Sequence, residues 1–320
     1  MSLRVVAPGG VGEVAEGDDL ATLLLAACDA DGIELLDGSI VTITSKVVSK
    51  AEGRHRVGDR LDAIDDESVR VLARRGPTSI VRTRLGLTMA AAGIDNSNVT
   101  AGQFLLLPED PDRSAVVVRE EVLARRGVNV GVLVTDTAGR PWRNGQTDIA
   151  IGAAGLVVLE EFAGVTDSYG NALAVTAPAV ADELAGLSEL ASGKLGGRPF
   201  TVITGREDLV LARGDHGSGA GALVREDGAD MFGLGSREAV VRALAASDAR
   251  LFGAPAASGD MHIAARDTFG AAELTEHGSI NVAVTGPATA TLAGVLAHAF
   301  GWEAHASPDG TEVTFQPPTP

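Results

Sequence analysis

The stretch of residues 128–135 most constrains the fold, because it is mainly apolar and lacks the polar alternation of a half-exposed strand. We therefore expect a strand that is covered on both faces. Polar residues follow it at once, namely Asp136, Thr137, Arg140 and Arg143. A carboxylate beside a hydroxyl offers the hard oxygen ligands that magnesium or manganese accepts, and arginine suits phosphate oxygens. This stretch predicts metal-assisted chemistry on a nucleotide.

Hydrophobic periodicity and turn residues predict a mixture of helices and strands along the whole chain. We expect strands at 3–7, 39–48, 79–89 and 200–205. We expect helices at 18–29, 67–75, 115–127, 179–195 and 236–246. A stretch rich in Ala, Pro, Ser and Gly at 253–259 predicts a domain boundary. The predicted domains are 1–248 and a small αβ appendage at 260–320, with a strand at 279–285, a helix at 287–300 and a strand at 311–316.

Composition restricts the class of protein. With 320 residues, 45% of them hydrophobic, the chain can bury one large core or two smaller ones. A formal net charge of −17 argues against a nucleic-acid binder, because phosphate backbones would be repelled. The longest apolar runs are too short to cross a membrane and no secretory signal is recognisable, so we expect a cytoplasmic protein. Cys28 is the single cysteine, which excludes an internal disulfide.

The use of lysine points to a binding site for anions. Only three of the 26 basic residues are lysines, and Lys46 and Lys50 are two of them. A compact ammonium group in a chain that otherwise uses arginine indicates phosphate contact. The alternative is that both are surface lysines on the edge of a strand.

Two acids, Asp95 and Asp136, follow or flank apolar stretches in what we expect to be polar turns, and Thr137 adds a hydroxyl. Such oxygens can hold one or two divalent cations that also bind phosphate. The amide of Asn98 is a candidate to bond a nucleotide directly. The alternative for each residue is a structural role, because Asp and Asn often close turns or cap helices.

Other signatures of chemistry are weak. Glycine-rich segments at 9–12 and 214–221 have backbone amides that can cradle phosphate, but neither fits a P-loop or a dinucleotide-binding fingerprint. The six histidines show no zinc-binding spacing, and no G-x-S-x-G turn of a serine hydrolase is present. Trp142 lies between two arginines and either stacks on a planar ring or covers the edge of the core.

Several long motifs occur in a fixed order along residues 5–245. They are TSKVVSKAEGR at 44–54, RLGL at 84–87, AGIDNSNV at 92–99, LLLPEDPD at 105–112, TDTAGRPWRNGQTD at 135–148 and AGVTDSYGN at 163–171. Together they resemble the coenzyme F-420:L-glutamate ligase family, and most closely the ligase domain of its two-domain actinobacterial members.

The resemblance implies an α+β fold with a mixed sheet of the gamma-glutamyl ligase type, assembled as a homodimer. It also implies GTP-dependent addition of L-glutamate to coenzyme F-420-0 and to its growing γ-linked tail. In that chemistry GTP converts a carboxylate into an acyl phosphate, which the glutamate amine attacks with release of phosphate. The implied cations are magnesium or manganese, with potassium as a further candidate.

The resemblance also assigns site residues. Asp95, Asp136 and Thr137 match the positions of the divalent-metal ligands, and Asp95, Asp136 and Lys50 are the implied catalytic residues. The implied GTP contacts are Gly10, Val11, Gly12, Glu13, Ser45, Lys46, Lys50 and Asn98.

This sequence departs from the family at three places. The N-terminal turn reads Gly-Val-Gly-Glu where relatives often carry Gly-Leu-Pro, and the loop near Gly217 has only Asp215 as an acid, which puts a complete second metal site in doubt. Residues after about 246 are too few for the flavin-binding domain of the two-domain relative, so we expect no FMN. Two alternatives stay open: a homologue that binds GTP or a deazaflavin without catalysis, and an amide ligase for another acid acceptor.

Overall fold

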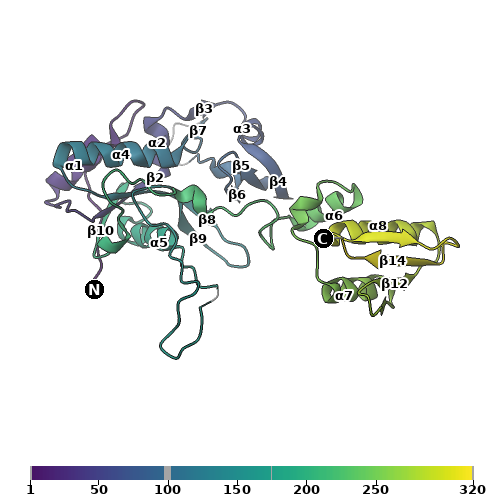
Figure 1. Cartoon of the computed structure of the whole chain (residues 1–320). Coiled ribbons are helices and arrows are strands. Elements are labelled where there is room, and N and C mark those ends of the chain that lie inside the picture. The colour runs from purple at the N-terminus through teal and green to yellow at the C-terminus, as the bar shows by residue number, and fades with distance from the viewer. Residues whose placement is uncertain (1, 97–101, 174, 319–320) are drawn as a thin grey trace. The chain divides into compact units, whose positions relative to one another are not determined.

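The computed structural model describes residues 2–96, 102–173 and 175–318. The chain divides into two compact units, residues 1–224 and 225–320, and each is described by itself (Figure 1). Among the described residues, no helix has both the length and the apolar character needed to cross a bilayer.

The first unit is built around a five-stranded mixed sheet with the order β1-β10-β2-β8-β9. Its strands are β1 (Arg4–Val6), β2 (Ile40–Thr44), β8 (Gly131–Gly139), β9 (Gln146–Ala154) and β10 (Phe200–Thr204). The pair β2 and β8 is parallel, and the other neighbours are antiparallel. Helices α1 (Leu20–Ala30), α2 (Ser45–Ala51) and α4 (Pro111–Arg126) lie on one side of this sheet, and α5 (Val180–Ser192) lies on the other (Figure 1).

The strand β8 confirms the prediction of a strand that is covered on both faces. Val132 and Val134 have no exposed surface and pack in the core beneath α1 and α4. Leu133, also fully buried, points to the opposite core against α5. Because side chains alternate along a strand, burial of all three requires a layer on each face of the sheet.

Two small sheets complete the first unit. They consist of β3 (His55–Val57) with β7 (Gln103–Leu105), and of β4 (Ser68–Arg75), β5 (Thr78–Thr83) and β6 (Thr88–Ala90) in that order. A short helix, α3 (Arg60–Asp66), precedes β4. Ile64, Val81 and Phe104 join these elements in a core of their own.

The helix expected at 67–75 is wrong, because this stretch forms the strand β4. Gly76 and Pro77 connect β4 to β5 as a hairpin, and Gly76 has the positive φ of +58° that such a turn favours. Pairing with β5 decided the conformation, and pairing between strands is invisible to local periodicity.

The strand expected at 39–48 ends early, and this changes where the lysines lie. It stops at Thr44 and the helix α2 begins at Ser45, which places Lys46 and Lys50 one helical turn apart. Val47 and Val48 belong to this helix, and their side chains are buried in the main core. Their packing overrides the preference of β-branched residues for strands.

Asp136 and Thr137 were expected in a turn, but both lie inside β8. The strand continues to Gly139 and pairs with β9, with Asp136 opposite Ile149 and Thr137 opposite Asp148. The register shifts between Val134 and Thr135, immediately before the acid. A bulge of this kind re-aims the side chains that follow it.

As far as residue 318, where the description ends, the second unit contains a four-stranded antiparallel sheet and three α-helices. The sheet order is β11-β12-β14-β13, with β11 (Glu273–Leu274), β12 (Ile280–Ala283), β13 (Glu303–Ala306) and β14 (Glu312–Gln316). The helices are α6 (Ser236–Leu244), α7 (Ser258–Phe269) and α8 (Pro287–Phe300). Its separate core includes Met261, Ile280 and Phe315.

Composition placed the domain boundary between 248 and 260, whereas the compact second unit begins at Arg225. The reason is that α6 packs against α8 and so joins this unit. The stretch 253–259, expected to be a linker, leads into α7, which periodicity did not predict.

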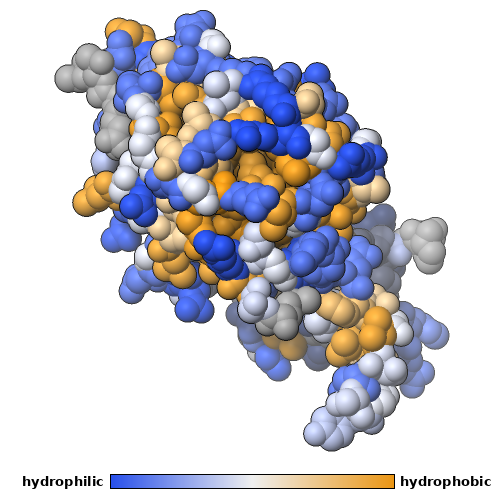
Figure 2. Space-filling view, turned by 90° about the vertical axis from the view of Figure 1, so that its left-hand side faces the viewer, coloured by the Kyte–Doolittle hydropathy of each residue, from blue (hydrophilic) through white to orange (hydrophobic). Residues whose placement is uncertain are grey.

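Apolar side chains also reach the surface of the first unit. Leu3 and Leu36 are about half exposed. On the face shown in Figure 2, hydrophilic residues surround a central area in which hydrophobic residues are visible. Scattered exposed apolar residues of this kind are ordinary in globular proteins.

Candidate functional site

A pocket of about 1010 Å³ opens in the first unit at the point where β2 ends and α2 begins. Its lining comes from the N-terminal turn at 11–14, the end of β2 with α2, the stretch 89–95, residues 105–107, the β8–β9 hairpin and the segment 189–199, together with Arg60. A cavity of this size accommodates a nucleotide together with smaller molecules.

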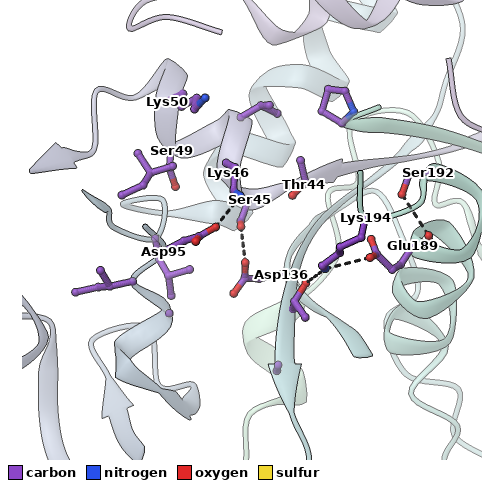
Figure 3. Close-up of a pocket in the computed structure, with 18 of the residues that line it drawn as sticks. Thr44, Ser45, Lys46, Ser49, Lys50, Asp95, Asp136, Glu189, Ser192 and Lys194 are labelled. Carbon is purple, nitrogen blue, oxygen red and sulfur yellow. Dashed lines mark hydrogen bonds and ion pairs between the residues drawn. The ribbon is translucent and has the colours of Figure 1, made fainter. Parts of the chain in front are cut away.

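The first turn of α2 contacts both of the predicted acids. The Ser45 hydroxyl donates a hydrogen bond of 2.7 Å to Asp136 Oδ1. The next residue, Lys46, places its Nζ atom 2.7 Å from Asp95 Oδ2. Figure 3 shows both acids directed toward this turn. Tertiary structure therefore brings together Asp95 and Asp136, which the sequence separates by some 40 residues.

Asp136 has an unusual electrostatic environment. The pKa of its carboxyl group is raised to about 7, chiefly by burial and also by the nearby carboxylates of Asp148 and Asp95, while the hydrogen bond from Ser45 opposes this rise. Several acids that surround one buried carboxylate repel each other when all are ionised. A bound cation would relieve that repulsion, because it offsets the negative charge.

Lys50 is a buried lysine that pairs with an exposed acid. Its side chain is 6% exposed and forms an ion pair with Glu13, whose own side chain is 79% exposed. Of the four residues 10–13 expected at the nucleotide, Val11, Gly12 and Glu13 line the pocket with Ser45, Lys46 and Lys50. Gly10 is not among the lining residues. Asn98 lies outside the described residues.

The opposite wall of the pocket contains residues that sequence reasoning missed. The Thr137 hydroxyl donates to Asp148 Oδ1 at 2.7 Å and accepts from Lys194 Nζ at 2.5 Å. Lys194 also lies 3.0 Å from Glu189 Oε1. The scarcity of lysine was the available signal for Lys194, because all three lysines of the chain line this pocket.

The donor set fits a divalent cation in part. Carboxylates of Asp95, Asp136 and Asp148 with the Thr137 hydroxyl supply hard oxygens of the required kind. However, the part of the chain that the structure describes contains no cluster of three or more His, Cys, Asp or Glu side chains arranged to hold a metal. A cation here would therefore need oxygens from a bound phosphate as well.

The glycine-rich loop at 214–221 lies away from this pocket and does not line it. It contacts the chain just after β9, where the Gly155 amide donates to the His216 carbonyl. Buried Arg119 holds the loop by donating to the Asp215, Leu211 and Ala212 carbonyls. These contacts give the loop a structural role.

Trp142 does not cover the core. It lies in the connection between β8 and β9, where the residue is 86% exposed and has a φ of +63°. Of its two sequence alternatives, packing at the edge of the core is therefore wrong.

Comparison with known proteins shows what the chain is similar to. The family described as F420-0:Gamma-glutamyl ligase matches residues 10–61 and 55–205. The coenzyme F420:L-glutamate ligase of Methanopyrus kandleri is 37% identical over 69% of this chain and 93% of its own length. The proteins of the same name from Methanothermobacter thermautotrophicus and Haloarcula marismortui are 35% and 36% identical and are covered over 90% and 98% of their lengths.

The mixed sheet and the acidic, lysine-lined pocket thus lie in a region that matches a class of ligases. The chain belongs to the F420-0:gamma-glutamyl ligase family, as its motifs indicated. The family match ends at residue 205, before the second unit begins at Arg225.

Proposed function

We propose that this protein is a GTP-dependent ligase that adds L-glutamate to coenzyme F-420-0 and extends the γ-linked glutamate tail. Membership of the family and the names of relatives with nearly full-length coverage support the acceptor and the amino acid. The nucleotide and the route through an acyl phosphate follow from the chemistry, since a carboxylate must be activated before an amine can attack it.

One observation carries the proposal: consecutive residues of α2 contact the two acids that flank the pocket. Ser45 binds Asp136 and Lys46 binds Asp95, with Lys50 one turn further along the same helix. Ammonium groups suit phosphate oxygens, and carboxylates suit the cations that accompany a nucleotide. The lysines that suit the phosphates and the carboxylates that suit the cation therefore lie next to each other on one wall of the pocket.

The proposed reaction has two steps. An oxygen of the acceptor carboxylate attacks the γ-phosphorus of GTP, the bond from that phosphorus to the β-γ bridging oxygen breaks, and GDP leaves. The amine nitrogen of glutamate then attacks the acyl carbon, the bond to the phosphate oxygen breaks, and inorganic phosphate and the amine proton are released. The new C–N bond remains in the amide product, and the new P–O bond leaves with inorganic phosphate, which carries one oxygen of the acceptor carboxylate.

Each pocket residue has a defined contribution in this proposal. Lys46 and Lys50 bind and orient the phosphates, and their charge offsets the negative charge that develops on them. Asp95, Asp136 and the Thr137 hydroxyl would hold magnesium or manganese, which neutralises phosphate charge when bound. The Ser45 hydroxyl fixes the orientation of the Asp136 carboxylate through their hydrogen bond.

Incubation with GTP, L-glutamate, coenzyme F-420-0 and magnesium tests this function. We expect products heavier by one or more glutamate residues in mass spectrometry, with one GDP formed per amide bond. GTP binding without turnover would instead favour a non-catalytic homologue, and turnover with another acid would favour a different acceptor. We also propose the homodimer implied by the family, which light scattering coupled to size-exclusion chromatography tests.

A further inference from the structure

The third lysine of the chain lies on the wall of the pocket that faces α2. Lys194 follows the C-terminal end of α5, between Gly193 and Gly196. Figure 3 shows Lys194 and Glu189 on one side of Asp136, with Lys46 and Lys50 on the other side. Asp136 thus lies between the two lysines of α2 and Lys194 (Figure 3).

Lys194 is held by contacts that a ligand could replace. Its Nζ atom is 2.5 Å from Thr137 Oγ1, 3.0 Å from Glu189 Oε1 and 3.8 Å from Asp148 Oδ1. Even so, its side chain is 61% exposed. An ion pair with this much solvent contributes little to stability. The contribution of these contacts to the stability of the fold therefore does not explain why a lysine is present at this position.

The surrounding charges show what Lys194 must counteract. Asp136, Asp148 and Glu189 are acids on its side of the pocket, and the whole chain carries a net charge of −17. A carboxylate that enters here meets repulsion from all of them. An ammonium group on a flexible four-carbon side chain can move from Glu189 to such a carboxylate and compensate for that repulsion.

We propose that Lys194 binds a carboxylate group of the substrates that meet the nucleotide at Asp136. This inference rests on the proposed function, which places the nucleotide phosphates on the α2 wall and leaves the opposite wall for the acid acceptor and the amino acid. Both substrates carry carboxylates, so the acceptor's terminal carboxylate and the free carboxylates of L-glutamate are the two sources that an experiment must separate.

The backbone around Lys194 gives its side chain freedom to change partners. Gly193 ends α5 with a φ of +66°, and a Cβ atom there would meet nothing within 4 Å. Neighbouring Leu195 is 99% exposed, so the segment is not packed against the core. The Nζ atom of Lys194 can therefore exchange one oxygen partner for another without a rearrangement of buried side chains.

The test compares Lys194→Met and Lys194→Arg with wild type. The matched control is Arg213→Met, which removes an exposed cation paired with Asp37 outside the pocket. Calorimetry measures the binding of L-glutamate, of coenzyme F-420-0 and of GTP, each with magnesium present. We expect Lys194→Met to weaken one of the two carboxylate ligands roughly ten-fold or more, because a hydrogen bond to a charged group is lost.

GTP affinity should change less than about two-fold, Lys194→Arg should restore part of the loss, and the control should match wild type. The ligand that is weakened identifies the source of the carboxylate. Unchanged binding of both carboxylate ligands, or an equal loss for GTP, would overturn the proposal. Calorimetry measures binding and needs no turnover. If the protein forms no glutamylated product but binds a carboxylate ligand through Lys194, the proposed reaction is refuted and the inference about Lys194 stands.

Discussion

Ser45 Oγ lies 2.7 Å from Asp136 Oδ1 and joins the first turn of α2 to the interior of β8, across 91 residues of sequence. Ser45 is buried, and the next residue along the helix holds Asp95. The parallel pairing of β2 with β8 produces this contact, because Thr44 and Thr135 are register partners and the residue after each reaches the same edge.

Asp136→Asn should lower kcat by about a thousand-fold or more, because it removes a charge from the centre of the proposed site. Steady-state assays of glutamylated product measure the effect. Asp182→Asn is a matched control, since Asp182 is also a partly buried acid, accepts a hydrogen bond from the Ala150 amide, and lies outside the pocket. Equal losses in both variants would contradict the assignment of Asp136.

The stability of the cation-free protein should depend on the titration of Asp136. Its pKa is raised from 3.8 to about 7 in the folded state, so between these values the folded state binds more protons than the unfolded state. Its contribution therefore becomes less favourable as the pH rises from about 4 to about 7, by up to about 4 kcal/mol.

Urea unfolding with a chelator present, repeated across this range, measures that contribution. Relative to wild type, Asp136→Asn should become progressively more stable as the pH rises, because the amide carries no charge. A difference between the two proteins that stays constant with pH would show that Asp136 does not titrate in this range.

Lys50→Met and Lys46→Met should each weaken GTP binding by about ten- to a hundred-fold, because each removes a charge that faces the phosphates. Fluorescent GTP analogues measure the affinity. Arg126→Met provides the comparison, since Arg126 is paired with Asp29 outside the pocket. GTP affinity that survives both lysine substitutions would place the nucleotide elsewhere.

Arg119→Lys should destabilise the first unit by about 2–4 kcal/mol, because a lysine cannot reproduce the fork of donors that is buried there. The guanidinium donates to the Val130 carbonyl, to Asn129 Oδ1 and to carbonyls of the loop beyond Leu209. Arg125→Lys on the same helix is exposed and should cost less than about 1 kcal/mol. Chemical unfolding of both variants checks the prediction, which fails if their losses are similar.

The thiol of Cys28 should resist alkylation in the native protein. It is 2% exposed, and burial, together with the nearby Asp29, raises its pKa to about 11. At about pH 8 very little thiolate is therefore present to react. Mass spectrometry after iodoacetamide treatment should show no label until denaturant is added, and rapid labelling of folded protein would contradict the buried position.

Sequence patterns located most of the elements that depend on local signals. Asp19 caps α1 by accepting from the Thr22 amide, and α8 runs from Pro287 to Phe300, which are the bounds that the sequence predicted. The apolar run before Asp136 indicated a buried strand. The family was also evident from motifs, because their residue types and spacing are preserved in the chain itself.

Only the tertiary structure decided the features that depend on distant partners. It made 68–75 a strand through pairing with β5, and it made 45–51 a helix through the burial of Val47 and Val48. It also brought Lys194 to Thr137, 57 residues away. Local sequence determines propensity and capping within a few residues, whereas strand register and side-chain packing determine which distant groups meet. The pocket is the product of those long-range contacts.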